Sequence, residues 1–465
     1  MASRGGFSSK IGFIAAAAGS AVGLGNIWKF PFEVANGGGA AFVVIYLAFC
    51  FILCFPVMVA EIAIGRKTQK NPAGAFAALG FPKWSFVGKL GIIAGVLILS
   101  FYNVVAGWAF GYVFEMFSGH FEVAANFGEY IKNVFKIGIY AIIFMSVTAF
   151  IVSKGVSAGI EKLSTILMPT LIIMILGLAI YAMTLPHAME GLKFYLVPDF
   201  SQLTPKVMYA ALGQAFFSLS LGMGALITYG SYVGKNDNII SSAALITLAD
   251  VGIAFLAGLM MFPFVAFKHS GDLASIEGGA GFIFTTLPAA FESISTGGAI
   301  VGGVFFLLLS FAALTSTVSL LEVPVAYVVD EHKIERKKAV IGVAILVFVI
   351  GIPSLLGNGY SEFLSSFISW YEDQELVSKT FMDFVEVLAS DTFLPLGGFM
   401  ISFFVGWVWK KAKRNEELAQ GNPNFEGSFV QKYLNFAITY LAPTVLGILF
   451  LLTVMSKTLG FELFG

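Results

Sequence analysis

The sequence predicts an all-α, polytopic membrane protein. Of its 465 residues, 58% are hydrophobic and only 12% are charged, whereas a soluble domain has about 25% charged residues. This much apolar surface cannot be buried in one soluble core, so much of it must face lipid. A series of long apolar runs supports the same conclusion, because each approaches the roughly 20 residues that a helix needs to cross a bilayer.

About eleven such runs follow one another along the chain and define the expected spans. They lie near 11–35, 41–65, 90–117, 136–153, 163–184, 207–233, 240–267, 297–329, 338–356, 381–409 and 433–456. The apolar segment 280–291 is too short to cross, so we expect a re-entrant or surface helix there. No soluble domain interrupts the series, and residues 1–465 are therefore predicted to form a single transmembrane domain.

The basic residues orient these spans. With a cytoplasmic N-terminus, most of the 27 lysine and arginine residues fall on inner loops, as the positive-inside rule requires. An odd number of spans then places the C-terminus outside. We expect a multi-pass protein of the cell's inner (plasma) membrane, surrounded by lipid. The net charge of −1 offers no basic field for nucleic acid.

Two of the expected spans contain glycine-rich interruptions, GSAVGLGN at 19–26 and SLSLGMG at 218–224. Unwound backbone is tolerated at membrane depth only where it lines a cavity. Two breaks five spans apart indicate two five-helix repeats, with a binding site between them. The repeats would cover about 8–185 and 205–410, followed by an extra helix at about 430–457. The structural alternative is that the glycines only permit close helix packing.

A broken helix offers two kinds of ligand. The half that begins after the break presents free N–H groups and the positive end of the dipole, which suit a carboxylate. The half that ends at the break presents free carbonyl oxygens, which suit sodium. Asp250 places a costly charge within a span, and a bound cation would offset that cost. Glu61 and Glu322 also lie within spans, where they can equally accept backbone N–H groups near the breaks.

Three longer motifs resemble the neurotransmitter:sodium symporter family. They are GSAVGLGNIWKFPF with NGGGAAF, then GQAFFSLSLGMGALITYGSYV, then FAALTSTVSL, and the resemblance covers nearly the whole chain. The sequence is most similar to the bacterial branch with eleven spans that takes hydrophobic amino acids. The resemblance implies a leucine-transporter-type fold, a five-plus-five inverted repeat with broken helices 1 and 6. It also implies a sodium-coupled symporter that imports aliphatic and aromatic L-amino acids by alternating access.

The resemblance also implies two sodium sites and one substrate site. The first sodium site would use Ala21, Asn26, Ser218 and Asp250. The second would use Gly19, Val22, Ala312, Thr315 and Ser316. The substrate site would use Ser20, Ala21, Gly23, Gly25, Ile98, Tyr102, Phe217, Ser218, Ser220, Met223, Ser316 and Leu320. Within it, the substrate carboxylate would meet the N–H groups of Gly23 and Gly25 and the Tyr102 hydroxyl.

An outer gate follows from the same resemblance. Phe217 over Tyr102 would cover the substrate, and Lys29 would pair with Asp383. Many relatives have arginine at the Lys29 position. Lysine lacks the bidentate fork of arginine, so we expect a weaker outer latch.

An inner gate is implied in the same way. Arg4 would pair with Asp330, assisted by Ser231 and Tyr232.

Chloride is the last feature that the resemblance addresses. Animal members of the family need chloride, whereas this chain has Asp250 where many relatives have a neutral asparagine. The serine that usually helps to hold chloride aligns with Ala254. A fixed carboxylate a few Å from sodium can balance its charge, so we expect chloride-independent transport.

Other functions remain open at this stage. The chain could transport another small zwitterion with sodium, form a channel, or bind an amino acid as a non-transporting receptor. The sequence contains no nucleophile elbow, Walker motif or metal-ligand spacing, so we expect no enzyme.

Overall fold

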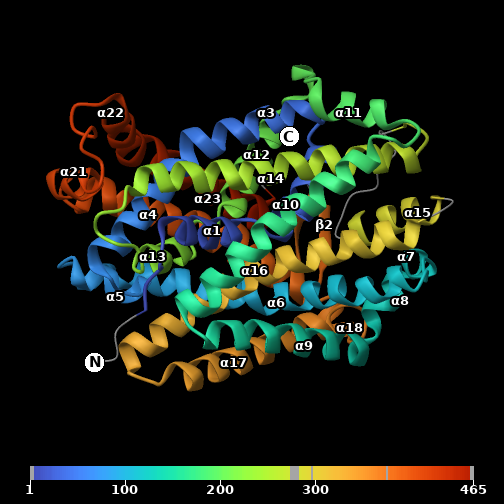
Figure 1. Ribbon diagram of the computed structural model, residues 1–465, viewed down its shortest axis with the longest axis horizontal. Helices are drawn as coiled ribbons and strands as arrows, with labels where there is room; N and C mark the ends of the chain where they lie inside the picture. The colour runs from blue at the N-terminus through green and yellow to red at the C-terminus, as the bar shows by residue number, and fades with distance from the viewer. Residues whose placement is uncertain (1–4, 273–281, 295–296, 373–374, 461–465) are drawn as a thin grey trace.

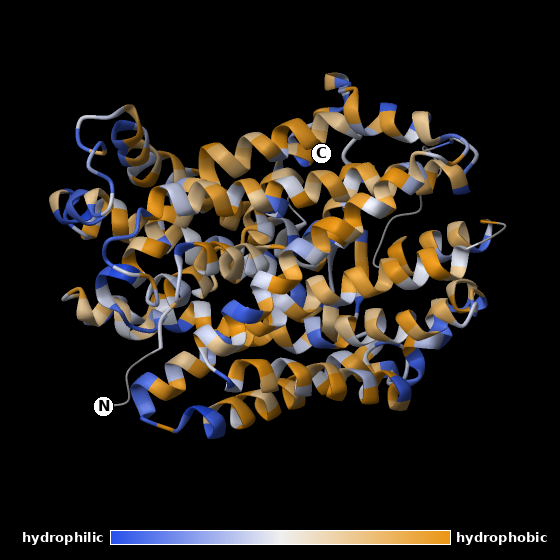
Figure 2. Ribbon diagram, viewed as in Figure 1, coloured by the Kyte–Doolittle hydropathy of each residue, from blue (hydrophilic) through white to orange (hydrophobic). Residues whose placement is uncertain are grey.

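The computed structural model describes residues 5–272, 282–294, 297–372 and 375–460, and nearly all of its elements are helical. Most of the long helices lie side by side along the long axis of the molecule (Figure 1). Hydrophobic residues predominate along the body of these helices, and hydrophilic residues gather toward the two ends of that axis (Figure 2). This distribution is typical of a helical membrane protein whose long axis crosses the bilayer.

The first half of the chain contains eleven α-helices within the described residues. They are α1 (Lys10–Ala21), α2 (Phe30–Asn36), α3 (Ala40–Phe49), α4 (Phe55–Thr68), α5 (Pro72–Ala78), α6 (Ser85–Phe117), α7 (Glu122–Ala125), α8 (Phe127–Lys132), α9 (Val134–Ser153), α10 (Lys162–Ala182) and α11 (Ala188–Leu196). Wider π-helical turns adjoin some of them, at Gly25–Lys29, Cys50–Cys54 and Val156–Glu161. Short 3₁₀ turns lie at Pro82–Trp84 and Phe200–Gln202.

The second half continues with helices and one hairpin. Its helices are α12 (Pro205–Ser218), α13 (Ala225–Gly230), α14 (Ile239–Lys268), α15 (Leu287–Glu292), α16 (Gly298–His332), α17 (Arg336–Leu356), α18 (Glu362–Ser365), α19 (Phe381–Glu386), α20 (Leu394–Phe403), α21 (Lys411–Ala419), α22 (Phe429–Phe436) and α23 (Ala442–Leu459). The strands are β1 (Ile368–Glu372) and β2 (Glu375–Lys379). Further π-helical turns lie at Phe282–Thr286, Val387–Phe393, Phe404–Val408 and Ala437–Leu441.

Side-chain caps begin several helices where the sequence supplies a short polar residue. Ser9 accepts the Gly12 N–H at the start of α1, Thr204 accepts the Val207 N–H at α12, and Asn238 accepts the Ser241 N–H at α14. Each cap provides a partner for a backbone donor that the helix itself leaves unpaired.

The described residues contain nine continuous spans rather than eleven, because two of the eleven expected spans are broken, as predicted. In the described residues, nine helices are long and apolar enough to cross a membrane: Ala40–Thr68, Pro82–Phe117, Val134–Ser153, Val156–Ala182, Ile239–Lys268, Gly298–His332, Arg336–Leu356, Phe381–Val408 and Phe429–Thr458. A pair bent by 52°, Lys10–Ala21 with Gly25–Asn36, makes a tenth. The expected span 207–233 is not a continuous helix, because residues 219–224 separate α12 from the short α13. The glycine-rich breaks account for the difference.

The short apolar segment is a helix, as expected, but it does not lie on the surface. It runs through the turn Phe282–Thr286 into α15, and residues 280 and 281 lie outside the described part of the chain. Phe284 is fully buried, and its ring packs edge-to-face against those of Trp108 and Tyr112 on α6. Of the two expected arrangements, re-entrant or surface, the surface one is therefore wrong, because neighbouring helices cover this segment.

Close backbone contact joins α4 to α13. A Cβ atom added at Gly65 would lie 2.1 Å from the Ile227 carbonyl oxygen, and one added at Gly230 would lie 2.6 Å from the Ile62 carbonyl oxygen. No side chain therefore separates the two helices here, and only glycine permits this approach at both positions.

A buried ion pair marks the end of the molecule that bears the N-terminal residues. Arg66 at the end of α4 donates from Nε to Glu417 Oε1 on α21 at 2.6 Å, and from Nη1 to the Asp237 carbonyl at 2.5 Å. Both side chains are almost fully buried. Phe7 N–H donates to the Tyr232 carbonyl in the loop that leads to Asp237. The N-terminal residues, this loop and α21 therefore share one face (left in Figure 1).

The hairpin is anchored by a single carboxylate. β1 and β2 are antiparallel, with Ile368 opposite Lys379. Glu372 accepts from Lys379 at 2.6 Å and from Lys457 of α23 at 3.2 Å. Partial burial alone would raise the pKa of Glu372, but the hydrogen bonds from Lys379 and Trp370 and the charge of Lys457 lower it to about 2. The carboxylate therefore stays ionised at neutral pH and ties the hairpin to α23.

The glycine contact between α4 and α13 predicts opposite effects for two similar substitutions. Gly65→Ala should destabilise the protein by about 1–3 kcal/mol, because the new methyl group overlaps a carbonyl oxygen. Gly177→Ala on α10 has open space around it and should stabilise by about 0.5–1 kcal/mol, through the better helix propensity of alanine. Thermal unfolding of both variants in detergent measures this. Equal midpoints for the two would contradict the packing.

Candidate functional site

The two helix breaks lie where the sequence predicts them. α1 ends at Ala21, and Val22 is extended, with φ −70° and ψ 111°. α12 ends at Ser218, and the residues that follow include three with positive φ: Ser220, Gly222 and Gly224. At Gly222, an added Cβ would lie 2.3 Å from the Leu394 carbonyl oxygen. Glycine is therefore needed there both for its backbone angle and for space.

Buried polar side chains hold the broken backbone. Glu61 on α4 accepts the Gly222 N–H at 2.7 Å, and Ser220 Oγ donates to the Ser20 carbonyl at 3.0 Å. Glu61 thus accepts a backbone N–H at a break, which is the structural role that the sequence suggested for it. Glu322 does not: it accepts from the Tyr232 hydroxyl at 2.7 Å and from Arg336 at 3.1 Å. The guanidinium compensates the buried charge of Glu322 instead.

The first predicted sodium set is drawn together from three helices. Asn26 Nδ2 donates to Asp250 Oδ1 at 2.7 Å and lies 3.1 Å from Ser218 Oγ. Ser218 Oγ donates to Asp250 Oδ2 at 3.0 Å. All three side chains are buried. The cluster therefore joins the break after α1, the end of α12 and the middle of α14.

The second predicted set lies between α1 and α16. Thr315 Oγ1 is 3.3 Å from the Val22 carbonyl oxygen and donates to the Ala312 carbonyl at 2.9 Å. Ser316 Oγ is 3.2 Å from the Val22 carbonyl oxygen. An added Cβ at Gly19 would lie 3.4 Å from Thr315 Cβ, so Gly19 belongs to the same neighbourhood. Uncharged carbonyl and hydroxyl oxygens at the end of an unwound helix are suitable ligands for sodium.

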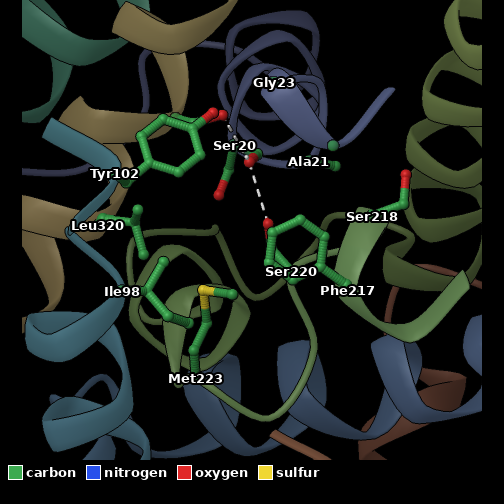
Figure 3. Close-up of a pocket in the computed structure, with 12 residues that line it drawn as sticks. Ser20, Ala21, Gly23, Ile98, Tyr102, Phe217, Ser218, Ser220, Met223 and Leu320 are labelled. Atoms are coloured by element: carbon green, nitrogen blue, oxygen red, sulfur yellow. Dashed lines mark hydrogen bonds between the residues drawn. The ribbon is translucent and has the colours of Figure 1, made fainter. Parts of the chain in front are cut away.

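A narrow pocket with a free volume of about 30 Å³ lies between the two breaks (Figure 3). The twelve residues predicted for the substrate all line it: Ser20, Ala21, Gly23, Gly25, Ile98, Tyr102, Phe217, Ser218, Ser220, Met223, Ser316 and Leu320. Tyr102 and Ser20 lie toward one end, whereas Ile98, Met223 and Leu320 lie together toward the other. The pocket therefore has a polar end and an apolar end.

The backbone at the polar end is partly paired within the protein. The Tyr102 hydroxyl accepts the Leu24 N–H at 2.8 Å, and the Gly23 N–H donates to Asn26 Oδ1 at 3.0 Å. A Cβ atom at Gly23 would lie 2.3 Å from Ser316 Oγ and 2.6 Å from the Tyr102 hydroxyl oxygen. Glycine at this position keeps the hydroxyl groups close to the broken backbone.

The outer ion pair differs from the expected one. Lys29 Nζ lies 3.6 Å from Glu386 Oε1, and also 4.8 Å from the centre of the Phe217 ring. Asp383 instead accepts from the backbone N–H and the hydroxyl of Thr380, in a capping box that begins α19. Asp383 and Glu386 lie about one helical turn apart. The capping box engages the Asp383 carboxylate, and Lys29 pairs with Glu386.

At the inner gate, Arg4 lies outside the described residues. Asp330 accepts from the backbone N–H and the side-chain amide of Asn71, at 3.2 Å and 3.3 Å. Tyr232 donates to Glu322, and Ser231 Oγ donates to the Thr228 carbonyl at 2.6 Å. The expected Arg4–Asp330 pair therefore remains a prediction.

Comparison with known proteins decides the family. The profile described as the sodium:neurotransmitter symporter family matches residues 4–133 and 125–415. The chain belongs to the sodium:neurotransmitter symporter family. An uncharacterized sodium-dependent transporter of Bacillus subtilis, YhdH, is 36% identical over 453 residues, which cover 96% of each chain. The human sodium- and chloride-dependent GABA transporter 2 is 26% identical over 414 residues, covering 77% of this chain and 68% of that protein.

A solved structure extends the similarity to the whole fold. The crystal structure of MhsT in complex with L-phenylalanine matches with a TM-score of 0.85 and 41% sequence identity, covering 96% of this chain and 99% of that chain. The chain is therefore a sodium-dependent transporter with a leucine-transporter-type helical membrane fold.

Three residues near the sites of this symporter escaped the sequence analysis. Tyr46 on α3 donates to Ser218 Oγ at 3.2 Å, and Gln214 on α12 donates to the Gly25 carbonyl at 2.9 Å. The third is Glu386 of the outer pair. A buried glutamine in a membrane helix is a usable signal, because an unpaired amide there is costly. Tyrosine in an apolar helix carries no such signal.

The cluster between α1 and α16 predicts a sodium effect on stability. When sodium replaces potassium in the buffer, the midpoint of thermal unfolding of the wild type should rise. A ligand at 100 times its Kd stabilises the folded protein by about 2.7 kcal/mol. Thr315→Ala with Ser316→Ala should lose most of this rise. The control removes two hydroxyl groups elsewhere on α16, Ser310→Ala with Thr317→Ala, and should keep it. A full sodium response in the first double variant would exclude the second site.

Proposed function

We propose that this protein is a sodium-coupled secondary active symporter that imports aliphatic and aromatic L-amino acids by alternating access. It uses two sodium ions per cycle, needs no chloride, and lies in the plasma membrane with its N-terminus in the cytoplasm and its C-terminus outside. One observation carries the proposal: a pocket between two helix breaks is polar at one end and apolar at the other, with two oxygen-rich clusters beside it.

The polar end suits the α-carboxylate and α-ammonium groups that all amino acids share. The helix that resumes after Val22 directs the positive end of its dipole toward the pocket, next to the Tyr102 hydroxyl. A carboxylate is favoured there and would take over N–H groups that now pair with Asn26 and Tyr102. The carbonyl oxygens of Ala21, Phe217 and Ser218 are the proposed acceptors for the ammonium group.

The apolar end suits a hydrophobic side chain. Met223 adapts its shape to different ligands because its thioether chain is flexible and polarizable, and Ile98 and Leu320 lie beside it (Figure 3). The similarity to MhsT supports an aromatic as well as an aliphatic substrate, since that relative binds L-phenylalanine in its crystal structure.

Three residues link sodium to substrate. Ala21 and Ser218 belong to the first sodium set and also line the pocket, and Ser316 does the same for the second set. Sodium bound at either cluster therefore fixes part of the substrate site, and substrate favours sodium in return. This reciprocity supports a symporter over a receptor that binds amino acids alone.

Proteoliposomes test the proposal. Vesicles loaded with unlabelled phenylalanine should accumulate labelled phenylalanine by counterflow, and a sodium gradient should drive uptake of leucine, methionine and phenylalanine. A receptor would bind without uptake, and a channel would not exchange; either result would reject the proposal. Tyr102→Phe should weaken binding by about 1–3 kcal/mol. Tyr112→Phe on the same helix should not, because its hydroxyl contacts the Phe284 carbonyl outside the pocket.

The Asp250 carboxylate predicts independence from chloride. It lies within hydrogen-bond distance of Asn26 and Ser218, so its charge can balance a sodium ion at that cluster. Replacement of chloride by gluconate should leave uptake unchanged in the wild type. Asp250→Asn should lower sodium affinity and make uptake sensitive to the anion. Loss of wild-type uptake in gluconate would show that the carboxylate does not replace an anion.

A further inference from the structure

A second pocket lies at the end of the molecule where α21 and α22 are found. Its lining residues fall between 406 and 440, whereas those of the substrate pocket fall between 20 and 320. We call it the α21–α22 groove. Its free volume is about 620 Å³, and its lining includes Lys411, Asn415, Lys432, Asn435, Phe436 and Tyr440. Lys411 and Lys432 come from different helices and are both exposed. None of the described lining residues is acidic. The groove therefore favours a negatively charged ligand.

The groove lies at the boundary of the membrane. The span Phe381–Val408 ends just before Lys411, and the span Phe429–Thr458 begins on the far side of the groove. Trp407, Phe436 and Tyr440 are each more than half exposed. Exposed aromatic side chains at the ends of spans are typical of the headgroup level of a bilayer. Hydrophilic residues also gather over α21 (Figure 2).

The aromatic wall is held in place from within the protein. Trp407 Nε1 donates to the Thr439 carbonyl at 2.8 Å, and its ring packs edge-to-face on Tyr440 at 5.6 Å. Beyond this wall, the last span is largely exposed, since only 33% of its most apolar stretch is buried within the protein. Acyl chains can therefore lie against the same helix that lines the groove.

The inner wall of the groove is a built polar surface. The Arg414 side chain is buried, with 1% of its surface exposed. Its guanidinium group donates to the Val405 carbonyl at 2.9 Å and to Asn435 Oδ1. This contact fixes the Asn435 amide and places a buried positive charge directly behind it. Asn415 Oδ1 is buried and has no partner among the described residues. An unpaired buried acceptor is costly, and a hydroxyl group of a ligand would relieve it.

We propose that the α21–α22 groove binds the headgroup of an anionic glycerophospholipid, with a phosphodiester beside Lys411 and Lys432. The lipid comes from the leaflet on the side of the N-terminal residues, because Arg66 and Glu417 place α21 on that face. Basic pockets between membrane helices recognise such headgroups through charge. A headgroup with hydroxyl groups, such as that of phosphatidylglycerol, also supplies a donor for Asn415. The proposal does not depend on which solute the protein transports.

Native mass spectrometry of the full-length protein in detergent tests this, with dioleoyl phosphatidylglycerol as the probe. The wild type should retain it, and Lys411→Gln with Lys432→Gln should bind it on the order of tenfold more weakly. The control, Lys410→Gln with Lys413→Gln, makes the same change of charge on lysines that do not line the groove and should bind as the wild type does. Equal binding by wild type and the Lys411/Lys432 variant would overturn the proposal.

Two further arms identify the ligand. Dioleoyl phosphatidylcholine should be retained several-fold less than phosphatidylglycerol, and equal retention would exclude selection by charge. Soluble glycerol 3-phosphate should not displace the lipid at matched concentrations; efficient displacement would indicate a site for a free phosphate instead. Thr439→Trp fills the groove without changing its charge and should also reduce retention. Undiminished binding in that variant would place the lipid elsewhere.

Discussion

Unwound backbone inside a membrane must find its hydrogen-bond partners within the protein, because lipid offers none. The rest of this structure depends on that constraint. Glu61 provides an acceptor for the break after α12, and Asn26 provides one for the break after α1. Gln214 and Ser220 supply donors to carbonyl oxygens at the first break. Apart from Asn26, each partner comes from elsewhere in the fold or from the opposite break, so both interruptions depend on the helices around them.

The same constraint explains why both ion clusters lie beside the pocket. The carbonyl oxygens that α1 exposes at its end are accessible to hydroxyl groups from α16, and the asparagine that follows reaches the carboxylate on α14. Polar groups in a membrane are expensive, so they gather where they can satisfy one another. A site rich in oxygen ligands is therefore the direct result of breaking two helices next to each other.

The two breaks could be predicted from the sequence because glycine clusters weaken a helix locally. The residues that line the pocket come from distant segments, and only the family resemblance indicated them. Long-range choices were harder. Lys29 pairs with Glu386 rather than Asp383, because the Asp383 carboxylate is hydrogen-bonded to Thr380 in the capping box at the start of α19. The nine continuous spans and the two broken ones in the described part of the chain agree with the prediction of about eleven spans, although hydropathy continues through residues 219–224 where the helix does not. The role of Tyr46 depends wholly on tertiary contacts.

The bare backbone contact between α4 and α13 has a mechanical consequence. Side chains that interdigitate can shift among rotamers, but carbonyl oxygens pressed against Gly65 and Gly230 leave no such freedom. Glu61 adds a hydrogen bond from α4 to Gly222, and Arg66 adds one to the loop after α13. We therefore expect α4 and α13 to move as one body. Because Gly222 is also bonded to α4, a rotation of that body relative to α12 would fall on residues 219–221.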